Sequence, residues 1–303
     1  MTAPDDLFPG FAEAAVGTGD ATIYARIGGQ GPPLLLLHGY PQTHAVWHRV
    51  APALAEHFTI VAPDLRGYGR SSCPPSDATH QAYAKRTMAD DMVRLMNHFG
   101  FDRFAVMGHD RGGRVAYRLA LDRPECVQRL VLIDIMSTWD QLQPAHQSTP
   151  EKLLHWAFLS QPAPIPETLI GANPVAWIEG RLRRGIQTNS LAAIDPRALA
   201  AYTASHSDPD CIHATCEDHR AGASCDLADD ETDRTIGRRI RCPTLAVWGT
   251  HGSLARIADP LALWGPWCDR LEGAAVESGH YILEENPAGL LAAVGSFLDP
   301  GEA

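Results

Sequence analysis

A Gly-x-Asp-x-Gly turn is the segment of this chain with the clearest chemical potential. It spans residues 108–112 (GHDRG), after the apolar residues 104–107 and before a helical pattern over 115–121. A strand, a sharp turn and a helix in this order present the central residue as a nucleophile. Asp110 is ionised at neutral pH, so its carboxylate can attack a saturated carbon without a base to activate it. An Asp at a helix start can also be a plain N-cap. The two flanking glycines favour the nucleophile and predict displacement at carbon.

Two arginines beside Asp110 indicate the charge of the substrate. Arg111 and Arg114 are three residues apart, so a helix places them on one face. They lie in the first helical turn, where the helix dipole is already positive. An anion must compensate them, and a guanidinium binds a carboxylate in a fork-like geometry. We therefore predict a substrate carboxylate at Arg111 and Arg114. An ion pair with an acidic residue of the chain is the alternative.

A base and an acid follow Asp110 along the chain. His280 lies in a Ser-Gly-His-Tyr segment just after the last predicted strand. It can take a proton from the water that hydrolyses an ester on Asp110. Asp134 ends the apolar run 130–133 and can hold the imidazole of His280 in its correct tautomer. Asp259 competes for this role, because it follows the next strand, but it lies well past the end of that strand. We favour Asp134 and interpret Asp259 as a surface or cap residue.

The elements that must position these residues follow from hydrophobic patterning. Short apolar runs alternate with helical patterns, which predicts an α/β fold with a mostly parallel sheet. The expected strands cover residues 21–27, 34–37, 58–62, 103–110, 130–133, 244–248 and 274–276, and the expected helices cover 46–54, 83–99, 111–121 and 290–298. Residues 137–233 show helical patches and no strand pattern. We therefore predict a core formed by residues 1–136 and 234–303, with an inserted helical cap over 137–233.

Composition excludes several classes of function. The 303 residues carry a net charge of −11, which argues against nucleic acid as a partner. No apolar stretch approaches the roughly 20 residues that cross a bilayer, and the acidic N-terminus lacks a signal-peptide pattern. The seven cysteines do not form a disulfide framework, so we expect a cytoplasmic location. His44 and His48, and a cysteine cluster near residue 216, lack the spacing of zinc sites, so we expect neither metal nor cofactor.

The chain order of Asp110, Asp134 and His280 resembles that of the α/β-hydrolase superfamily over residues 21–298. Within that superfamily, several segments resemble the fluoroacetate (haloacetate) dehalogenases. These segments are residues 38–41 (HGYP), 108–114 (GHDRGGR), 155–156 (HW) and 216–223 (CEDHRAGA). The resemblance implies hydrolytic dehalogenation of a short, anionic 2-halo acid through an ester on Asp110. It also implies a homodimer.

The resemblance assigns further residues to the site. His155 and Trp156, and by position His219, would bind the departing halide. The family usually has Tyr where this chain has His219. The backbone N–H groups of Tyr40 and Arg111 would form an oxyanion hole. The alternatives are core packing for Trp156 and Tyr40 and a solvated loop for His219.

Two other functions stay open. An epoxide hydrolase would use the same Asp110, Asp134 and His280, but it usually needs two cap tyrosines to protonate the opening oxygen. The only tyrosine between residues 137 and 233 is Tyr202. A hydrolase-like protein that binds a ligand without turnover is the second alternative, and the intact Asp–Asp–His order argues against it.

Overall fold

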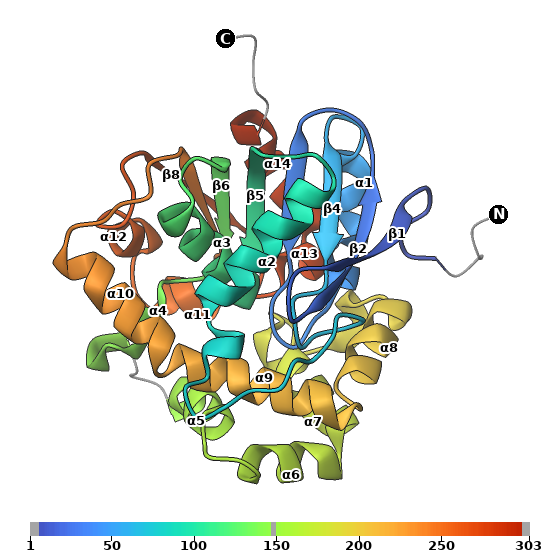
Figure 1. Ribbon diagram of the computed structural model, residues 1–303, viewed down its shortest axis with the longest axis vertical. Coiled ribbons are helices and arrows are strands. Elements are labelled where there is room, and N and C mark those ends of the chain that lie inside the picture. The colour runs from blue at the N-terminus through green and yellow to red at the C-terminus, as the bar shows by residue number, and fades with distance from the viewer. Residues whose placement is uncertain (1–5, 147–149, 299–303) are drawn as a thin grey trace.

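An eight-stranded sheet forms the centre of the protein (Figure 1). The computed structural model describes residues 6–146 and 150–298. The strands are β1 Ala12–Gly17, β2 Thr22–Gly28, β3 Pro33–Leu37, β4 Thr59–Pro63, β5 Phe104–His109, β6 Val127–Ile133, β7 Thr244–Gly249 and β8 Leu271–Val276, in the spatial order β1-β2-β4-β3-β5-β6-β7-β8. Only β1–β2 and β2–β4 are antiparallel pairs. The prediction of a mostly parallel α/β sheet is therefore confirmed.

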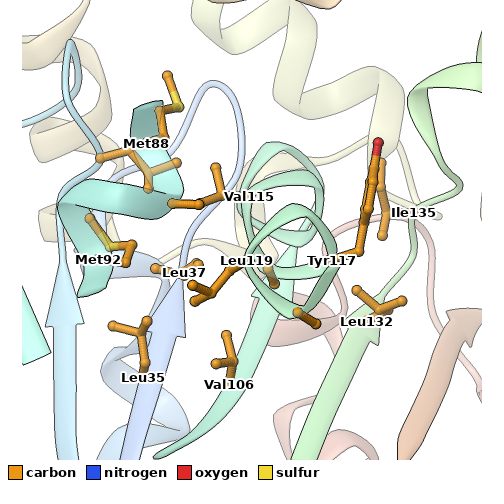
Figure 2. Close-up of a cluster of buried hydrophobic side chains, with 14 of the residues drawn as sticks. Leu35, Leu37, Met88, Met92, Val106, Val115, Tyr117, Leu119, Leu132 and Ile135 are labelled. Carbon is orange, nitrogen blue, oxygen red and sulfur yellow. The ribbon is translucent and has the colours of Figure 1, made fainter. Parts of the chain in front are cut away.

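Both faces of the sheet are covered, which explains its continuous apolar strands. Leu35 and Leu37 of β3 point to one face, where they pack with residues of α2 (Lys85–His98) and α3 (Arg111–Asp122) (Figure 2). Leu34 and Leu36 point to the other face, in a cluster with residues of α14 (Pro287–Leu298). The period of two along a strand thus places each leucine in one of two separate cores. The strands in turn fix where their carboxyl ends present side chains.

A run of helices joins β6 to β7 and lies beyond the end of the sheet (Figure 1). These helices are α4 Thr138–Leu142, α5 Pro150–Leu159, α6 Ile165–Ala172, α7 Pro174–Gly185, α8 Pro196–Ser205, α9 Pro209–Gly222 and α10 Cys225–Thr235. No strand occurs in the described residues of this segment, 137–146 and 150–233. Helix α9 contacts α5 and α6 and is buried along most of its length. The remaining α-helices are α1 Ala51–Leu54, α11 Ser253–Ile257, α12 Pro260–Trp264 and α13 Ile282–Glu285.

Two elements differ from the sequence-based expectation. The helix expected over 46–54 is a 3-10 helix, His44–Arg49, followed by the separate helix α1. Pro52 lacks an N–H and its ring crowds the carbonyl four residues earlier, so one continuous helix cannot form there. Strand β1 was not predicted, because it is an edge strand with Val16 as its single buried residue and so shows little hydrophobic alternation. No helix in the described part of the chain is long and apolar enough to cross a membrane.

Candidate active site

The turn between β5 and α3 holds Asp110 in a strained conformation. Its φ of 48° and ψ of −115° are unfavourable for a residue with a side chain. The glycines on either side let the backbone close up around it. A Cβ at Gly108 would lie 2.5 Å from the Gly112 carbonyl oxygen, and a Cβ at Gly112 would lie 2.4 Å from that of His38. The turn therefore needs both glycines and projects Asp110 from the carboxyl end of the central strand.

Asp110 is held in its ionised form. The backbone N–H of Tyr40 donates a 3.0 Å hydrogen bond to Oδ1, which places this donor as the predicted oxyanion hole requires. Desolvation in the site would raise the pKa of Asp110. The nearby His280, His109 and Arg111 and the Tyr40 N–H outweigh it and lower the pKa to about 2. The side chain is 21% exposed, so a ligand in the adjoining cavity can reach it.

His280 is oriented by Asp134. Its Nδ1 lies 2.6 Å from Asp134 Oδ2, while the Gly249 N–H donates to Asp134 Oδ1 at 3.1 Å. Since a carboxylate only accepts, Nδ1 carries the proton and the lone pair of Nε2 is directed away from Asp134. Nε2 lies 3.8 Å from Asp110 Oδ2. Burial opposes protonation, but the hydrogen bond and charge of Asp134 raise the pKa of His280 above its ordinary 6.5. Asp259 instead caps α12, accepting the Leu261 N–H at 3.0 Å.

Two residues that the sequence did not assign to the site hold the His280 backbone. The His280 N–H donates to the Gly185 carbonyl of α7 at 2.8 Å. His109 Nε2 lies 3.0 Å from the His280 carbonyl, and the two imidazole rings are 4.7 Å apart. The backbone of His280 is thus hydrogen-bonded both to His109, beside Asp110, and to Gly185 of α7. Neither contact has a sequence signal, because both join segments far apart in the chain.

Arg111 forms an ion pair within the protein, which was the alternative to a substrate carboxylate at this residue. Its Nε and Nη2 contact the two carboxylate oxygens of Asp218 at 2.8 and 2.7 Å. Asp218 also binds Lys85 and accepts the Tyr68 hydroxyl at 2.6 Å. Arg111 Nη1 is nevertheless buried with no hydrogen-bond partner among the described residues. Asp218 therefore neutralises most of this guanidinium and leaves one donor for a ligand.

Arg114 lacks such a partner. It is 2% exposed and forms no ion pair in residues 6–146 and 150–298. Its Nη1 donates to Thr138 Oγ1 at 3.0 Å, and its Nε has no hydrogen-bond partner in the same residues. Burial lowers its pKa, against smaller opposing contributions. The guanidinium carbon of Arg114 lies 5.1 Å from the centroid of the Trp156 ring, and that of Arg111 lies 5.0 Å from the same centroid. A buried, uncompensated cation is costly, so Arg114 is a strong candidate to bind an anion.

His155 and His219 share one hydrogen bond. Their Nε2 atoms are 3.1 Å apart, and His219 Nδ1 lies 2.7 Å from the Thr215 carbonyl oxygen. A carbonyl only accepts, so His219 carries its proton on Nδ1 and its Nε2 must accept from His155. Burial, followed by nearby arginines, lowers the pKa of both imidazoles well below 6.5. Neutral His219 therefore presents a lone pair where a tyrosine hydroxyl would present a donor.

A cavity of about 310 Å³ joins these groups. All but Tyr40 of the predicted site residues line it, namely Asp110, Arg111, Arg114, Asp134, His155, Trp156, His219 and His280. The buried Tyr40 packs its ring against His155 and His219, at 5.5 and 5.2 Å. Sequence reasoning missed Arg181, Arg184, Arg256 and Tyr281, which also line the cavity.

Tyr202 is not part of this cavity. It is buried, and its hydroxyl donates to Glu284 at 2.6 Å. It therefore cannot serve as the ring-opening donor that an epoxide hydrolase needs. Among the residues that the structure describes, no group of three or more His, Cys, Asp or Glu side chains is arranged to hold a metal ion.

Comparisons with known proteins identify the family to which the chain belongs. A family model described as the α/β hydrolase fold matches residues 32–287. A fluoroacetate dehalogenase from Burkholderia sp is 41% identical over 281 residues, covering 93% of this chain and 91% of the relative. A soluble epoxide hydrolase from Corynebacterium sp. is 32% identical, covering 86% and 87%. A solved structure from Nostoc sp PCC 7120, provisionally described as an α/β hydrolase, is 45% identical with a TM-score of 0.90, covering 96% and 98%.

Proposed function

The chain belongs to the α/β hydrolase family, and from that premise we propose that it is a hydrolytic dehalogenase of short 2-halo acids. The observation that carries this proposal is the pairing of an ionised Asp110 with the buried, uncompensated Arg114 in one cavity. A nucleophilic carboxylate suits displacement at carbon, and a buried cation without a counter-ion suits an anionic substrate.

In the first step Asp110 attacks the carbon that bears the halogen. A new C–O bond forms as the C–halogen bond breaks, and the halide leaves with the bonding electron pair. Arg114 and the free Nη1 of Arg111 hold the substrate carboxylate, which fixes the reacting carbon against Asp110. Trp156 donates its indole N–H to the departing halide, and His155 turns its Nε2–H from His219 to the halide. The product of this step is an alkyl ester of Asp110.

In the second step water hydrolyses the ester. His280 Nε2 takes a proton from the water, and the resulting hydroxide attacks the carboxyl carbon of Asp110. Asp134 stabilises the imidazolium that forms, through its 2.6 Å contact with Nδ1. The Tyr40 N–H donates to the oxyanion of the tetrahedral species. Its collapse breaks the bond between the carboxyl carbon and the substrate oxygen, which leaves as the 2-hydroxy acid with the proton from His280, and Asp110 returns to a carboxylate by releasing a proton. The net reaction turns a 2-halo acid and water into a 2-hydroxy acid, halide and a proton. In this scheme residues 137–233 act as the cap that supplies the halide site.

Epoxide hydrolysis is the second candidate, favoured by the Corynebacterium relative. Tyr202, which is the only tyrosine between residues 137 and 233, donates its hydroxyl to Glu284 and does not line the cavity, although Tyr281 of the core does. A neutral epoxide would also leave Arg114 without a counter-ion. The contact of Tyr202 with Glu284 and the unpaired Arg114 support the halo acid over the epoxide.

Halide release separates the candidates. Fluoro-, chloro- and bromoacetate are incubated with the enzyme, with styrene oxide as the epoxide control, and halide is measured with an ion electrode. We expect halide from at least one acid, no diol from the epoxide, and loss of halide release in Asp110→Asn. Release of diol without halide would refute the proposal in favour of epoxide hydrolysis. If neither halide nor diol formed, turnover of both substrate classes would be refuted.

A further inference from the structure

Arg181 is a cationic group in the cavity that the proposed mechanism does not use. It lies on α7 with Arg184 and Gly185, three and four residues on, and all three line the cavity. Its Nε is buried, and the described residues give Arg181 neither an ion pair nor a hydrogen bond. Arg183 of the same helix is different, because it is exposed, does not line the cavity and pairs with Glu179 at 3.4 Å.

The charges around the cavity exceed what one carboxylate can balance. Five arginines and two aspartates line it. Asp218 neutralises Arg111, and Arg256 donates to the His251 carbonyl at 2.9 Å. A substrate with one carboxylate that engages Arg114 would leave Arg181 and Arg184 without an anionic partner among the described residues. The cavity is therefore matched to a ligand with more than one negative charge, although the protein as a whole is acidic.

The cavity also has room for a larger acid. A monohaloacetate has five non-hydrogen atoms, which fill at most about 150 Å³ at the roughly 30 Å³ that a water molecule takes in the liquid. The cavity measures about 310 Å³. Gly185 lets the Tyr281 ring pack closely against α7, since a Cβ there would lie 2.5 Å from that ring. Space remains beyond the reacting carbon for another acidic group.

Arg114 and Arg181 approach the cavity from different elements. Arg114 belongs to α3 and lies against Trp156 and Thr138. Arg181 belongs to α7, and its positive charge acts on His155, Tyr40 and Tyr281, opposing the protonated form of His155. Arg114 and Arg181 are thus carried by two different helices and line one cavity that also contains Asp110.

We propose that the preferred substrates are 2-halo acids with a second acid group, such as 2-halosuccinates, and that Arg181 binds the distal carboxylate. This rests on the proposed function and specifies its substrate class. Arg114 binds the carboxylate next to the reacting carbon. Asp110 displaces the halide from that carbon, and hydrolysis releases a 2-hydroxy diacid, halide and a proton.

The test compares two four-carbon acids that differ in the second charge. The ratio of kcat/KM for 2-chlorosuccinate to kcat/KM for 2-chlorobutyrate is measured in the wild type, Arg181→Gln, Arg181→Lys and the control Arg183→Gln. We expect the ratio to exceed one in the wild type and to fall about tenfold or more in Arg181→Gln, because a charge-assisted hydrogen bond is lost. Arg181→Lys should restore part of it, and Arg183→Gln should leave the ratio unchanged.

Two results would overturn the assignment. Equal losses on both acids in Arg181→Gln would make Arg181 a general attractor of anions. A loss that follows the halogen, seen when bromo and chloro acids are compared, would assign Arg181 to the halide. Binding of succinate and butyrate to Asp110→Asn, by calorimetry, separates this inference from the proposed function. Tighter succinate binding that requires Arg181 supports the subsite even if no halo acid is turned over, and equal binding of both acids refutes it.

Discussion

Arg114 should be important for activity and yet reduce the stability of the empty enzyme. The guanidinium is buried without a counter-ion and keeps one hydrogen bond, to Thr138, and a contact with the Trp156 ring. Arg114→Met removes the charge and retains an unbranched side chain of similar length. The variant therefore tests whether the buried cation is present for an anionic ligand or for the fold.

The expected stability change is the balance of three contributions. Removing the charge recovers a desolvation penalty of several kcal/mol. The substitution also removes about 1.5–3 kcal/mol of stability from the charged hydrogen bond and about 0.5–2 kcal/mol from the contact with Trp156. We expect a net stabilisation of about 1–2 kcal/mol, which raises Tm by about 1.5–3 °C in a protein of 303 residues. The value of kcat/KM for halo acids should fall at least about 30-fold, because the substrate carboxylate loses a buried partner.

Arg118 offers a matched control one turn further along α3. It is equally buried, but it contacts Asp230 and Asp233 at 2.7 and 2.5 Å. Arg118→Met leaves the buried Asp230 without an ion pair in the described part of the chain and Asp233 with its contact to Arg238, and it should destabilise the protein by about 3–5 kcal/mol. Thermal melts with and without acetate measure both variants, and acetate should raise the Tm of the wild type and not that of Arg114→Met. If Arg114→Met destabilised the protein as strongly as Arg118→Met does, the reasoning would be wrong.

Three further predictions concern the chemical steps. His280→Asn should form the ester on Asp110 and fail to hydrolyse it. After incubation with bromoacetate, intact-protein mass spectrometry should find the mass of one added carboxymethyl group, and an unchanged mass would contradict this. Asp134 raises the pKa of His280, and a base must be unprotonated, so turnover should fall as the pH drops through a value above 6.5. In Asp134→Asn the acidic side of the pH–activity profile should move to lower pH. An unchanged profile would exclude His280 as the group that titrates there. His219→Tyr replaces a ring nitrogen lone pair by a hydroxyl donor, and fluoride gains more than bromide from a hydrogen-bond donor. The ratio of kcat/KM for fluoroacetate to kcat/KM for bromoacetate should therefore rise by about fivefold or more. An unchanged ratio would remove His219 from the halide site.

The sequence alone was sufficient to predict the strand–turn–helix at Asp110 and the parallel sheet that presents it. Both depend on local patterns, namely glycines two residues from Asp110 on either side and apolar runs of strand length. The roles of Asp110 and His280 were likewise predictable from local patterns and from their order along the chain. Strand β1 escaped prediction because an exposed edge strand carries little hydrophobic alternation.

Only the tertiary structure decided which charges stay uncompensated. Arg111 and Arg114 look equivalent in the sequence, but Asp218, 107 residues further on, pairs with Arg111 alone. The pairing of Asp134 with His280, 146 residues away, was predicted from their chain order, but its 2.6 Å contact depends on how β6 and β8 lie in the sheet. The proton arrangement of His155 and His219 follows from two helices, α5 and α9, that pack together. Such contacts arise from the packing of distant segments, and short-range sequence patterns carry no information about them.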